Sequence, residues 1–333
     1  MKKVRIGILG CGGMAGFHLS RLRANADAEL VALCDAKEEI ARAFAERHLK
    51  DHQPQPVVYP DPAAMYAGAN LDAVLIATPH TQHFEQGAQA IRAGCHVLME
   101  KPMVTSSKQA QELAAIVAES GLVFTIGYNT PCTPEMLFIR NLIRSGEMGR
   151  LATVSCWQTQ DWRRFTTGTW RQDPALSGGG MMYDSGAHVF NTLVWTVEQP
   201  VAEVAAFIDN VGTPVDIVGT VNMRFANGTL ATMAIDGNCT DAGSGMVYTF
   251  ETGRVSVDAW GGAWIEVFKK GSKVKYPRVE GEFQAPLDNF VDAILGRAEP
   301  RTNPRYGILQ SEIMDAIYES AKTGTIVSVK SSA

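Results

Sequence analysis

Short apolar runs alternate with amphipathic segments from the amino terminus to about residue 127. The apolar runs, which predict buried strands, are residues 4–9, 29–34, 73–77 and 96–99. The segments with a helical pattern are residues 37–48, 84–93 and 106–120. Strands that alternate with helices in this way are typical of βαβ units with a parallel sheet. We therefore expect an N-terminal α/β domain of residues 1–127.

Strands predominate in the rest of the chain. They are expected at residues 151–157, 201–208, 218–225, 230–236, 247–251, 254–260 and 264–269. Glycine-containing turns at residues 226–228 and 252–253 favour hairpins between neighbouring strands. Helical patterns cover residues 134–145, 287–295 and 306–323. The change of rhythm predicts a second domain, residues 128–333, built mainly of strands.

The first strand leads directly into a glycine-rich turn, Gly10-x-Gly12-Gly13-Met14-Ala15. This is the pattern of a dinucleotide-binding turn, in which Gly10 permits the tight turn and Gly12 lets backbone N–H groups reach a pyrophosphate. The small Ala15 allows the following helix to pack closely on the strand. We expect Gly10, Gly12, Gly13 and Met14 to contact a dinucleotide.

An acidic residue, Asp35, stands where the second strand ends. A carboxylate at this point is suited to the adenosine ribose hydroxyls and would repel a 2′-phosphate. The sequence therefore favours NAD, although Lys37 close by leaves NADP open.

Polar residues follow the third and fourth apolar runs. Thr78, Pro79 and His83 come after residues 73–77, and Glu100 and Lys101 come after residues 96–99. Ligands of open α/β sheets bind in the crevice at the carboxyl ends of the strands. We expect all five residues to contact the cofactor and Lys101 to reach the substrate as well.

The residues best suited to chemistry are Asp184 and His188, which are four positions apart and follow a run of three glycines. Residues four apart lie on one face of a helix, so an acid and an imidazole at this spacing can act on one small target. No other histidine occurs after His96. The alternative is a capping aspartate with a core histidine that bonds a backbone carbonyl.

A polar and aromatic segment precedes the glycine run. Its aromatic rings can stack on sugars, and its guanidinium groups can donate paired hydrogen bonds to hydroxyls or a carboxylate. We expect Trp162 and Arg163 to border a substrate site, and Trp170 and Arg171 to lie nearby. An ordinary surface loop anchored by a buried tryptophan is the alternative.

Together these motifs resemble the glucose–fructose oxidoreductase, inositol dehydrogenase and rhizopine-catabolism (Gfo/Idh/MocA) oxidoreductase family. The resemblance rests on the glycine turn, Thr78-Pro79 with His83, Glu100-Lys101-Pro102, Gly127-Tyr128, and Gly178-Gly179-Gly180 with Asp184 and His188. It implies a Rossmann domain followed by a predominantly antiparallel α+β domain, whose open sheet often forms a subunit interface. It also implies that Trp170 and Arg171 contact the dinucleotide.

The resemblance implies hydride transfer between the nicotinamide and a secondary alcohol of a sugar, polyol or cyclitol. Lys101, Asp184 and His188 would be the catalytic group, with His188 as the base, Lys101 stabilising the alkoxide and Asp184 orienting the substrate. No metal is expected. The alternatives are an NAD-dependent glycosidase, which oxidises its sugar transiently, and a non-catalytic regulator that senses a dinucleotide.

Two positions depart from the family pattern. Residues 129–134 lack an arginine that is often present there, and Asn191 replaces an acid that is common three residues after the histidine. We expect Asn129 to contact the substrate, but these departures leave the identity of that substrate open.

The composition agrees with a two-domain enzyme of 333 residues that are 46% hydrophobic. A net charge of −5 predicts no nucleic-acid partner. The six cysteines show no metal-ligand spacing and are expected to be reduced. We see no signal peptide and no stretch long enough to span a membrane, so we expect a cytoplasmic homodimer or homotetramer.

Overall fold

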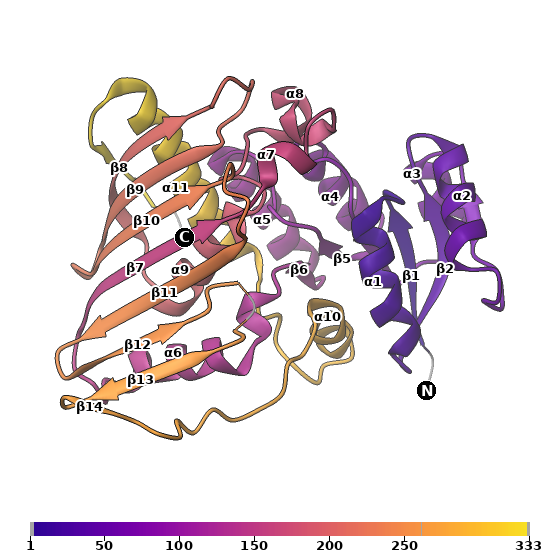
Figure 1. The fold of residues 1–333 in the computed structure, drawn as a ribbon. Coiled ribbons are helices and arrows are strands. Elements are labelled where there is room, and N and C mark those ends of the chain that lie inside the picture. The colour runs from indigo at the N-terminus through magenta and orange to yellow at the C-terminus, as the bar shows by residue number, and fades with distance from the viewer. Residues whose placement is uncertain (1–2, 261, 332–333) are drawn as a thin grey trace. The chain divides into compact units, whose positions relative to one another are not determined.

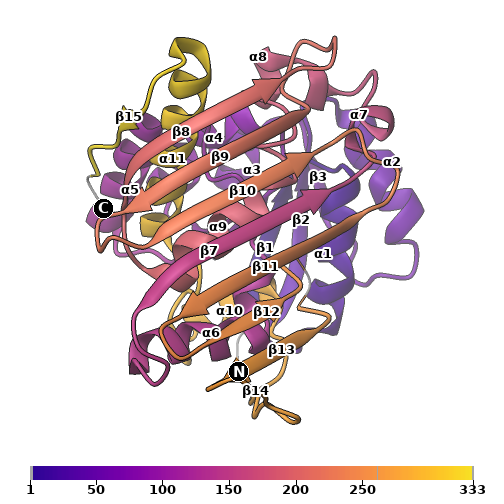
Figure 2. The same cartoon turned by 60° about the vertical axis from the view of Figure 1, so that its left-hand side comes forward.

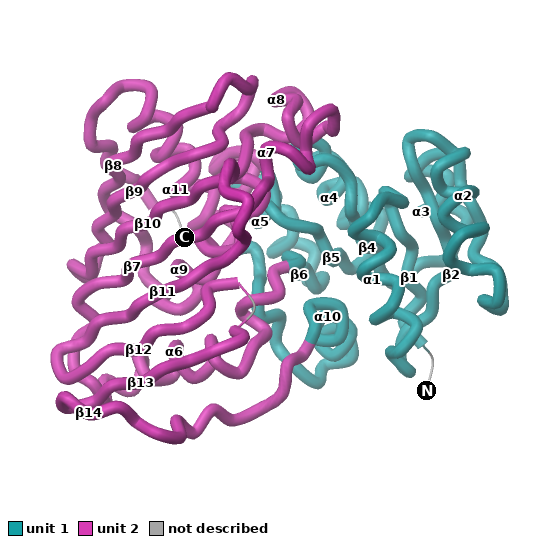
Figure 3. Tube along the Cα trace, in the orientation of Figure 1, with its two compact units in different colours: residues 1–104, 111–127, 285–304 teal, residues 105–110, 128–284, 305–333 magenta. Residues whose placement is uncertain are grey.

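The computed structural model describes residues 3–260 and 262–331. Packing divides the chain into two compact units, shown in Figure 3. Unit 1 comprises the chain up to Val104, Gln111–Gly127 and Ala285–Pro304. Unit 2 comprises Thr105–Ala110, Tyr128–Gln284 and the chain from Arg305 onward.

Unit 1 contains a six-stranded sheet in the order β3-β2-β1-β4-β5-β6, in which every neighbouring pair is parallel (Figure 1). The strands are β1 (Val4–Leu9), β2 (Ala28–Cys34), β3 (Val57–Tyr59), β4 (Ala73–Ile76), β5 (His96–Met99) and β6 (Phe124–Ile126). This order is that of the doubly wound dinucleotide-binding fold. The expected α/β sheet is confirmed, with the short strands β3 and β6 in addition.

The helices of this part of the chain connect successive strands. They are α1 (Gly13–Ala24), α2 (Glu38–His48), α3 (Pro62–Gly68), α4 (His83–Arg92) and α5 (Ser107–Ser120), with a 3₁₀ turn η1 (His80–Gln82) before α4. α5 begins in unit 2 and continues in unit 1. Because helices cover the sheet, its central strand β4 is apolar along its whole length, and all four of its residues are buried.

The segment 285–304 completes unit 1 although it comes late in the sequence. Helix α10 (Pro286–Ile294) places Leu287, Phe290 and Val291 in the same apolar cluster as strand residues of the six-stranded sheet. Further on, the Ile126 N–H donates to the Thr302 carbonyl at 2.8 Å, and the Thr302 hydroxyl donates to the Ile126 carbonyl at 2.6 Å. The segment therefore also covers the edge strand β6. The division into units therefore differs from the expected single domain boundary after residue 127, because residues 285–304 pack with unit 1.

Unit 2 contains a nine-stranded sheet in the order β14-β13-β12-β11-β7-β10-β9-β8-β15 (Figure 2). The strands are β7 (Leu151–Thr159), β8 (Val201–Asp209), β9 (Val218–Phe225), β10 (Leu230–Asp236), β11 (Gly243–Phe250), β12 (Gly253–Val257), β13 (Ile265–Lys269), β14 (Ser272–Lys273) and β15 (Val327–Ser328). Within this sheet, among the described residues, only the β7–β10 pair is parallel. The predominantly antiparallel sheet is confirmed.

Three long helices cover one face of this sheet. They are α6 (Pro134–Ser145), α9 (Gly186–Val197) and α11 (Pro304–Thr323). Their apolar residues join the inward side chains of the strands in one cluster. Along β9, inward residues are buried and the residues between them are mostly exposed. The shorter helical turns are η2 (Thr130–Cys132), α7 (Trp162–Phe165), η3 (Trp170–Gln172) and α8 (Pro174–Ser177).

None of the helices in the described part of the chain has both the length and the apolar character needed to cross a bilayer.

An ion-pair cluster ties α6 to the end of α9. Glu198 accepts hydrogen bonds from Arg140 and Arg144, one of them from the Arg144 Nη2 at 2.7 Å. Burial alone would raise the pKa of Glu198, but the two guanidinium groups outweigh it and hold this pKa at about 2, against 4.5 ordinarily. This lowered pKa stabilises the fold fully above pH 4.5, and the contribution is lost as the pH falls through about 2.

We expect Glu198→Gln to lower stability at pH 7 by about 2 kcal/mol, because the neutral amide cannot pair with both arginines. The gap in melting temperature between variant and wild type should be narrower at pH 3 than at pH 7. Thermal unfolding at both pH values measures it. A gap of the same size at both would contradict the role of the ionised carboxylate.

Candidate active site

The turn between β1 and α1 forms a cradle whose shape depends on glycine. Gly10 has φ +92°, and a Cβ there would lie 2.7 Å from the Ala77 carbonyl oxygen. Gly12 precedes the first residue of α1 in an extended conformation, and a Cβ at Gly12 or Gly13 would meet nothing within 4 Å. The first N–H groups of a helix have no partner within the helix and attract anions. The space beside Gly12 therefore suits the pyrophosphate of a dinucleotide.

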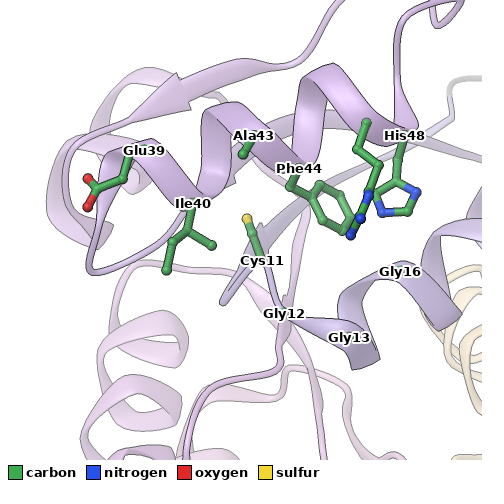
Figure 4. A pocket seen from close by; sticks show the side chains of 10 residues that line it. Cys11, Gly12, Gly13, Gly16, Glu39, Ile40, Ala43, Phe44 and His48 are labelled. Carbon is green, nitrogen blue, oxygen red and sulfur yellow. The ribbon is translucent and has the colours of Figure 1, made fainter.

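A cavity of ≈ 920 Å³ opens at this cradle, and Figure 4 shows the side chains around it. One side is formed by Cys11, Gly12, Gly13 and Gly16, and the other by α2 with Glu39, Ile40, Ala43, Phe44, Arg47 and His48. Sequence reasoning did not assign the α2 residues to the site. The only signal for them was that α2 directly follows Asp35.

Asp35 holds the cradle against the start of the next loop. Its Oδ2 accepts the Cys11 N–H at 2.9 Å, and its Oδ1 accepts the Lys37 N–H at 3.1 Å. Each carboxylate oxygen has two lone pairs, so Asp35 keeps the capacity to accept ribose hydroxyls. The residues present here therefore fit an NAD-type cofactor.

His83 is placed differently from the expectation that it contacts the cofactor. Its ring is fully buried, with Nδ1 2.7 Å from the Pro102 carbonyl oxygen and Nε2 2.9 Å from the Thr78 carbonyl oxygen. Burial lowers the pKa of this ring, and the two carbonyl oxygens oppose that shift. The ring has no exposed surface that could contact a cofactor. Its contacts with the Thr78 and Pro102 carbonyl oxygens instead join the loops that follow β4 and β5. The Thr78 hydroxyl is directed to Gln86, at 2.5 Å.

Glu100 and Lys101 follow β5 as expected. Glu100 is buried, and its Oε1 lies 2.6 Å from the Nε2 of His18 on α1. Burial would raise the pKa of Glu100, but the hydrogen bond and charge of His18, with the charge of Lys101, hold it below the usual range. Lys101 is partly exposed.

In unit 2, Asp184 and His188 are both buried, but only His188 lies in a helix. Helix α9 begins at Gly186, and Asp184 belongs to the turns before it. The Asp184 N–H donates to the Gly180 carbonyl at 3.0 Å, and the His188 N–H donates to the Ser185 carbonyl at 3.2 Å. The expectation that Asp184 and His188 lie on one helix was therefore wrong, because Asp184 belongs to a turn that precedes α9.

Two side chains fix the carboxylate of Asp184. Its Oδ2 accepts the indole N–H of Trp162 at 2.8 Å and the Nε–H of Arg171 at 2.9 Å. Trp162 is fully buried in the core of unit 2, so it cannot stack on a sugar as expected. Arg171 also lies over the ring of Trp170, 4.6 Å from its centroid. Trp162 and Arg171 therefore orient Asp184.

Aromatic rings enclose His188. The Trp260 ring stacks on the imidazole with centroids 5.1 Å apart, and Tyr128 meets it edge-on at 5.7 Å. The Tyr128 hydroxyl donates to the Gln310 Oε1 at 2.5 Å, and the Asn191 side-chain amide donates to the same oxygen at 3.3 Å. Sequence reasoning missed Trp260, which has no motif around it, and used Tyr128 only as part of the family pattern.

The three glycines before Asp184 allow close packing within unit 2. A Cβ at Gly178 would lie 2.5 Å from Thr105, one at Gly179 would lie 2.4 Å from the Tyr318 hydroxyl, and one at Gly180 would lie 2.0 Å from the Asp216 carbonyl oxygen.

The side chain of Asp216 also accepts hydrogen bonds from the turn that contains Gly180. It accepts the N–H groups of Gly180 and Met182 at 2.7 and 2.8 Å and the Tyr318 hydroxyl at 2.5 Å. Asp216 is a further supporting residue that no sequence signal indicated.

Two further substrate candidates, Asn129 and Arg163, belong to unit 2. Asn129 directly precedes η2 and is half-buried. Arg163 is half-buried in α7, with its Nη1 3.4 Å from the Asn238 side-chain oxygen.

In the part of the chain that the structure describes, the six cysteines form no disulfide, and five of them are buried. Burial, and after it the charge of Asp35, raise the pKa of Cys11 to about 12. The thiol beside the cradle is therefore protonated at neutral pH. Across residues 3–260 and 262–331, no group of three or more His, Cys, Asp or Glu side chains is arranged to hold a metal ion.

Family models cover most of the chain. Residues 4–128 match the oxidoreductase family with an NAD-binding Rossmann fold (GFO/IDH/MocA), and residues 136–261 match the GFO/IDH/MocA C-terminal domain.

Several curated relatives are similar in sequence. The chain is 28% identical to D-glucoside 3-dehydrogenase of Escherichia coli over 59% of its own length and 55% of that protein. It is 29% identical to the rhizopine catabolism protein MocA of Rhizobium meliloti, over 60% and 59% of the two chains. An inositol 2-dehydrogenase of Saccharopolyspora erythraea is 26% identical over 88% and 86%. The alignments to the first two thus span little more than half of those relatives.

Solved structures share the whole fold. The WlbA dehydrogenase of Bordetella pertussis, in complex with NADH and UDP-GlcNAcA, superposes with a TM-score of 0.87 at 23% identity, covering 99% of this chain and 100% of that one. An aldose-aldose oxidoreductase of Caulobacter crescentus, complexed with glycerol, gives 0.84 at 22% identity over 98% and 100%.

Proposed function

Because this chain belongs to the Gfo/Idh/MocA family of oxidoreductases with an NAD-binding Rossmann fold, we propose that it transfers a hydride between the nicotinamide and a secondary alcohol of a sugar, polyol or cyclitol. The observation that carries this proposal is the buried pair Asp184 and His188. Aromatic rings pack against His188, and hydrogen bonds from Trp162 and Arg171 fix Asp184. Relatives named as a glucoside dehydrogenase and an inositol dehydrogenase support the substrate class.

The proposed catalytic residues are Lys101, Asp184 and His188. His188 accepts the hydroxyl proton at a ring nitrogen, since an imidazole titrates near neutral pH. The ammonium of Lys101 stabilises the negative charge that develops on the substrate oxygen. Asp184 accepts a hydrogen bond from a neighbouring hydroxyl of the substrate and so orients the substrate. NAD, when bound, supplies the carbon that accepts the hydride.

The cofactor contacts are proposed for the cradle, for loops of unit 1 and for two residues of unit 2. Gly10, Gly12, Gly13 and Met14 would meet the pyrophosphate, and Asp35 the adenosine ribose. Thr78, Pro79, Glu100, Lys101, Trp170 and Arg171 complete the proposed set, with His83 acting through the loops that it joins. For the substrate we propose Asn129 and Arg163, together with Lys101, Asp184 and His188. NAD is preferred over NADP because of the Asp35 charge.

The proposal is tested by nicotinamide absorbance. Purified protein is mixed with NAD or NADP and a panel of inositols, aldoses, anhydrosugars and sugar acids. NADH formed with one of them establishes both reaction and cofactor. Hydrolysis of a glycoside without net NADH would instead identify the glycosidase alternative. NAD binding with neither reaction would identify the sensor.

We expect Gly12→Ala to weaken NAD binding by roughly 10- to 100-fold, the scale of one or two lost hydrogen bonds to charged oxygens. The new methyl group meets no protein atom within 4 Å, so it occupies space beside the helix terminus and not the core. The melting temperature without ligand should stay close to wild type. Ser20→Ala, at an exposed position of the same helix that does not line the cavity, is the matched control. Titration calorimetry measures both, and an unchanged affinity in Gly12→Ala would contradict the cradle.

We also propose a cytoplasmic homodimer or homotetramer that assembles through the open face of the nine-stranded sheet. Phe207 in β8 is 74% exposed and Trp157 in β7 is 49% exposed. Strand register places them on one face, because Phe207 pairs with Thr220, Thr220 with Ala234, and Ala234 with Trp157. An exposed apolar row of this kind is typical of an interface. Analytical ultracentrifugation measures this: wild type should sediment as an oligomer and Phe207→Lys as a monomer.

A further inference from the structure

We infer that His18 is a positioning residue for Lys101, acting through the carboxylate of Glu100. The inference rests on the proposed role of Lys101. His18 lies on α1, five residues after Gly13, and is 3% exposed. Its Nε2 and the Glu100 Oε1 are 2.6 Å apart.

The same carboxylate reaches the backbone of the lysine. The Glu100 Oε2 accepts the Lys101 N–H at 3.1 Å, while the N–H of Glu100 itself donates to the Ile76 carbonyl of β4 at 2.8 Å. The side chain of Glu100 is thus held by His18 at one oxygen and holds Lys101 with the other. A change at His18 is therefore transmitted to Lys101 through one buried group.

The surroundings leave little alternative for this carboxylate. A Cβ at Gly127 would lie 3.2 Å from the Glu100 Oε1, so the glycine provides the room that the side chain needs. A buried carboxylate without a donor is costly and either takes up a proton or moves. Loss of the His18 donor at Oε1 would therefore displace the carboxylate and weaken the hydrogen bond that Oε2 accepts from the Lys101 N–H.

His18 also connects Lys101 to the cradle. The first turn of α1 borders the space beside Gly12, and His18 lies on the same rigid helix. His83 fixes the other side of the lysine by its contact with the Pro102 carbonyl. The position of Lys101 relative to the cradle is consequently set by two buried imidazoles from two helices.

The test compares His18→Phe, which keeps an aromatic ring without a donor, with His18→Gln, which keeps an N–H donor. Two quantities are measured in the full-length protein: the rate at which an amine-reactive reagent labels Lys101, followed by peptide mass spectrometry, and kcat with the Kd for NAD. Lys37, which is exposed at the start of α2, is the internal control for labelling.

In His18→Phe we expect labelling of Lys101 to be faster by about 3-fold or more, with Lys37 unchanged. We expect kcat to fall by about 10- to 100-fold, because displacement of a catalytic group by ~1 Å costs on that scale, while the Kd for NAD stays within about 3-fold. His18→Gln should restore both rates to near wild type.

Wild-type labelling of Lys101 in His18→Phe would overturn the inference. Faster labelling of Lys101 and Lys37 together would also overturn it, since that result indicates general destabilisation, and so would equal defects in the Phe and Gln variants. If the wild-type protein turns over no alcohol of the panel, the proposed function fails, and the labelling of Lys101 still decides the inference.

Discussion

Replacing Lys101 with methionine is expected to lower kcat by roughly 10²–10³-fold while the Kd for NAD stays within about 3-fold of wild type. Methionine keeps an unbranched apolar chain of similar length but has no positive charge. Only the stabilisation of the developing alkoxide is then lost, whereas the cradle at Gly12 and the carboxylate of Asp35 are unchanged.

The matched control is Lys37→Met, which removes an exposed lysine near the same cradle. It should leave kcat unaltered. Steady-state kinetics and titration of NAD, measured on both variants, separate binding from chemistry. Equal loss of affinity and turnover in Lys101→Met would mean that this lysine serves the cofactor and not the reaction.

The largest effect on stability is expected from Gly180→Ala. The added Cβ would lie 2.0 Å from the Asp216 carbonyl oxygen and 2.8 Å from its nitrogen, and neither backbone atom can move like the end of a side chain. Overpacking of this kind costs roughly 3 kcal/mol, which for a domain of this size lowers the melting temperature by about 5–10 °C. Turnover should fall too, because the displaced turn carries Asp184.

Gly212→Ala is the control for this change. Unlike Gly180, Gly212 has a positive φ, +73°, but a Cβ there would meet nothing within 4 Å, so alanine adds backbone strain without a collision. Differential scanning calorimetry should show a much smaller shift, consistent with a cost of about 1 kcal/mol. If both variants melt together, close packing at Asp216 is not what the glycine run provides.

Local patterns predicted most of the fold because the strands of each unit have a distinct signature. The apolar runs of β1, β4 and β5 indicated a parallel sheet, and the predominance of strands after residue 150 indicated a second, strand-rich domain. The strands β3 and β6 were missed because three residues give no usable period. The apolar stripe of α10 predicted a helix correctly, but a stripe does not specify which core it joins.

The site was predictable as far as it depends on residue type and spacing. The cradle, Asp35, and the position of Lys101 after β5 followed from the order of strands and turns. The burial of Trp162 and His83 did not, since an aromatic ring or imidazole near a loop suits a ligand and a core equally well. The contact between His188 and Trp260 joins residues 72 positions apart, a pairing that a single sequence does not encode.

The late segment of unit 1 determines when that unit can fold during synthesis. The six strands of its sheet have all been translated by Ile126, but Leu287, Phe290 and Val291 complete the apolar cluster on which the sheet depends. More than 150 residues of unit 2 must leave the ribosome in between. Domains that are continuous in sequence fold in order from the N-terminus. Here the nascent dinucleotide-binding unit must instead wait for the unit encoded after it, and a fragment that ends at Gly127 would expose the face that α10 covers.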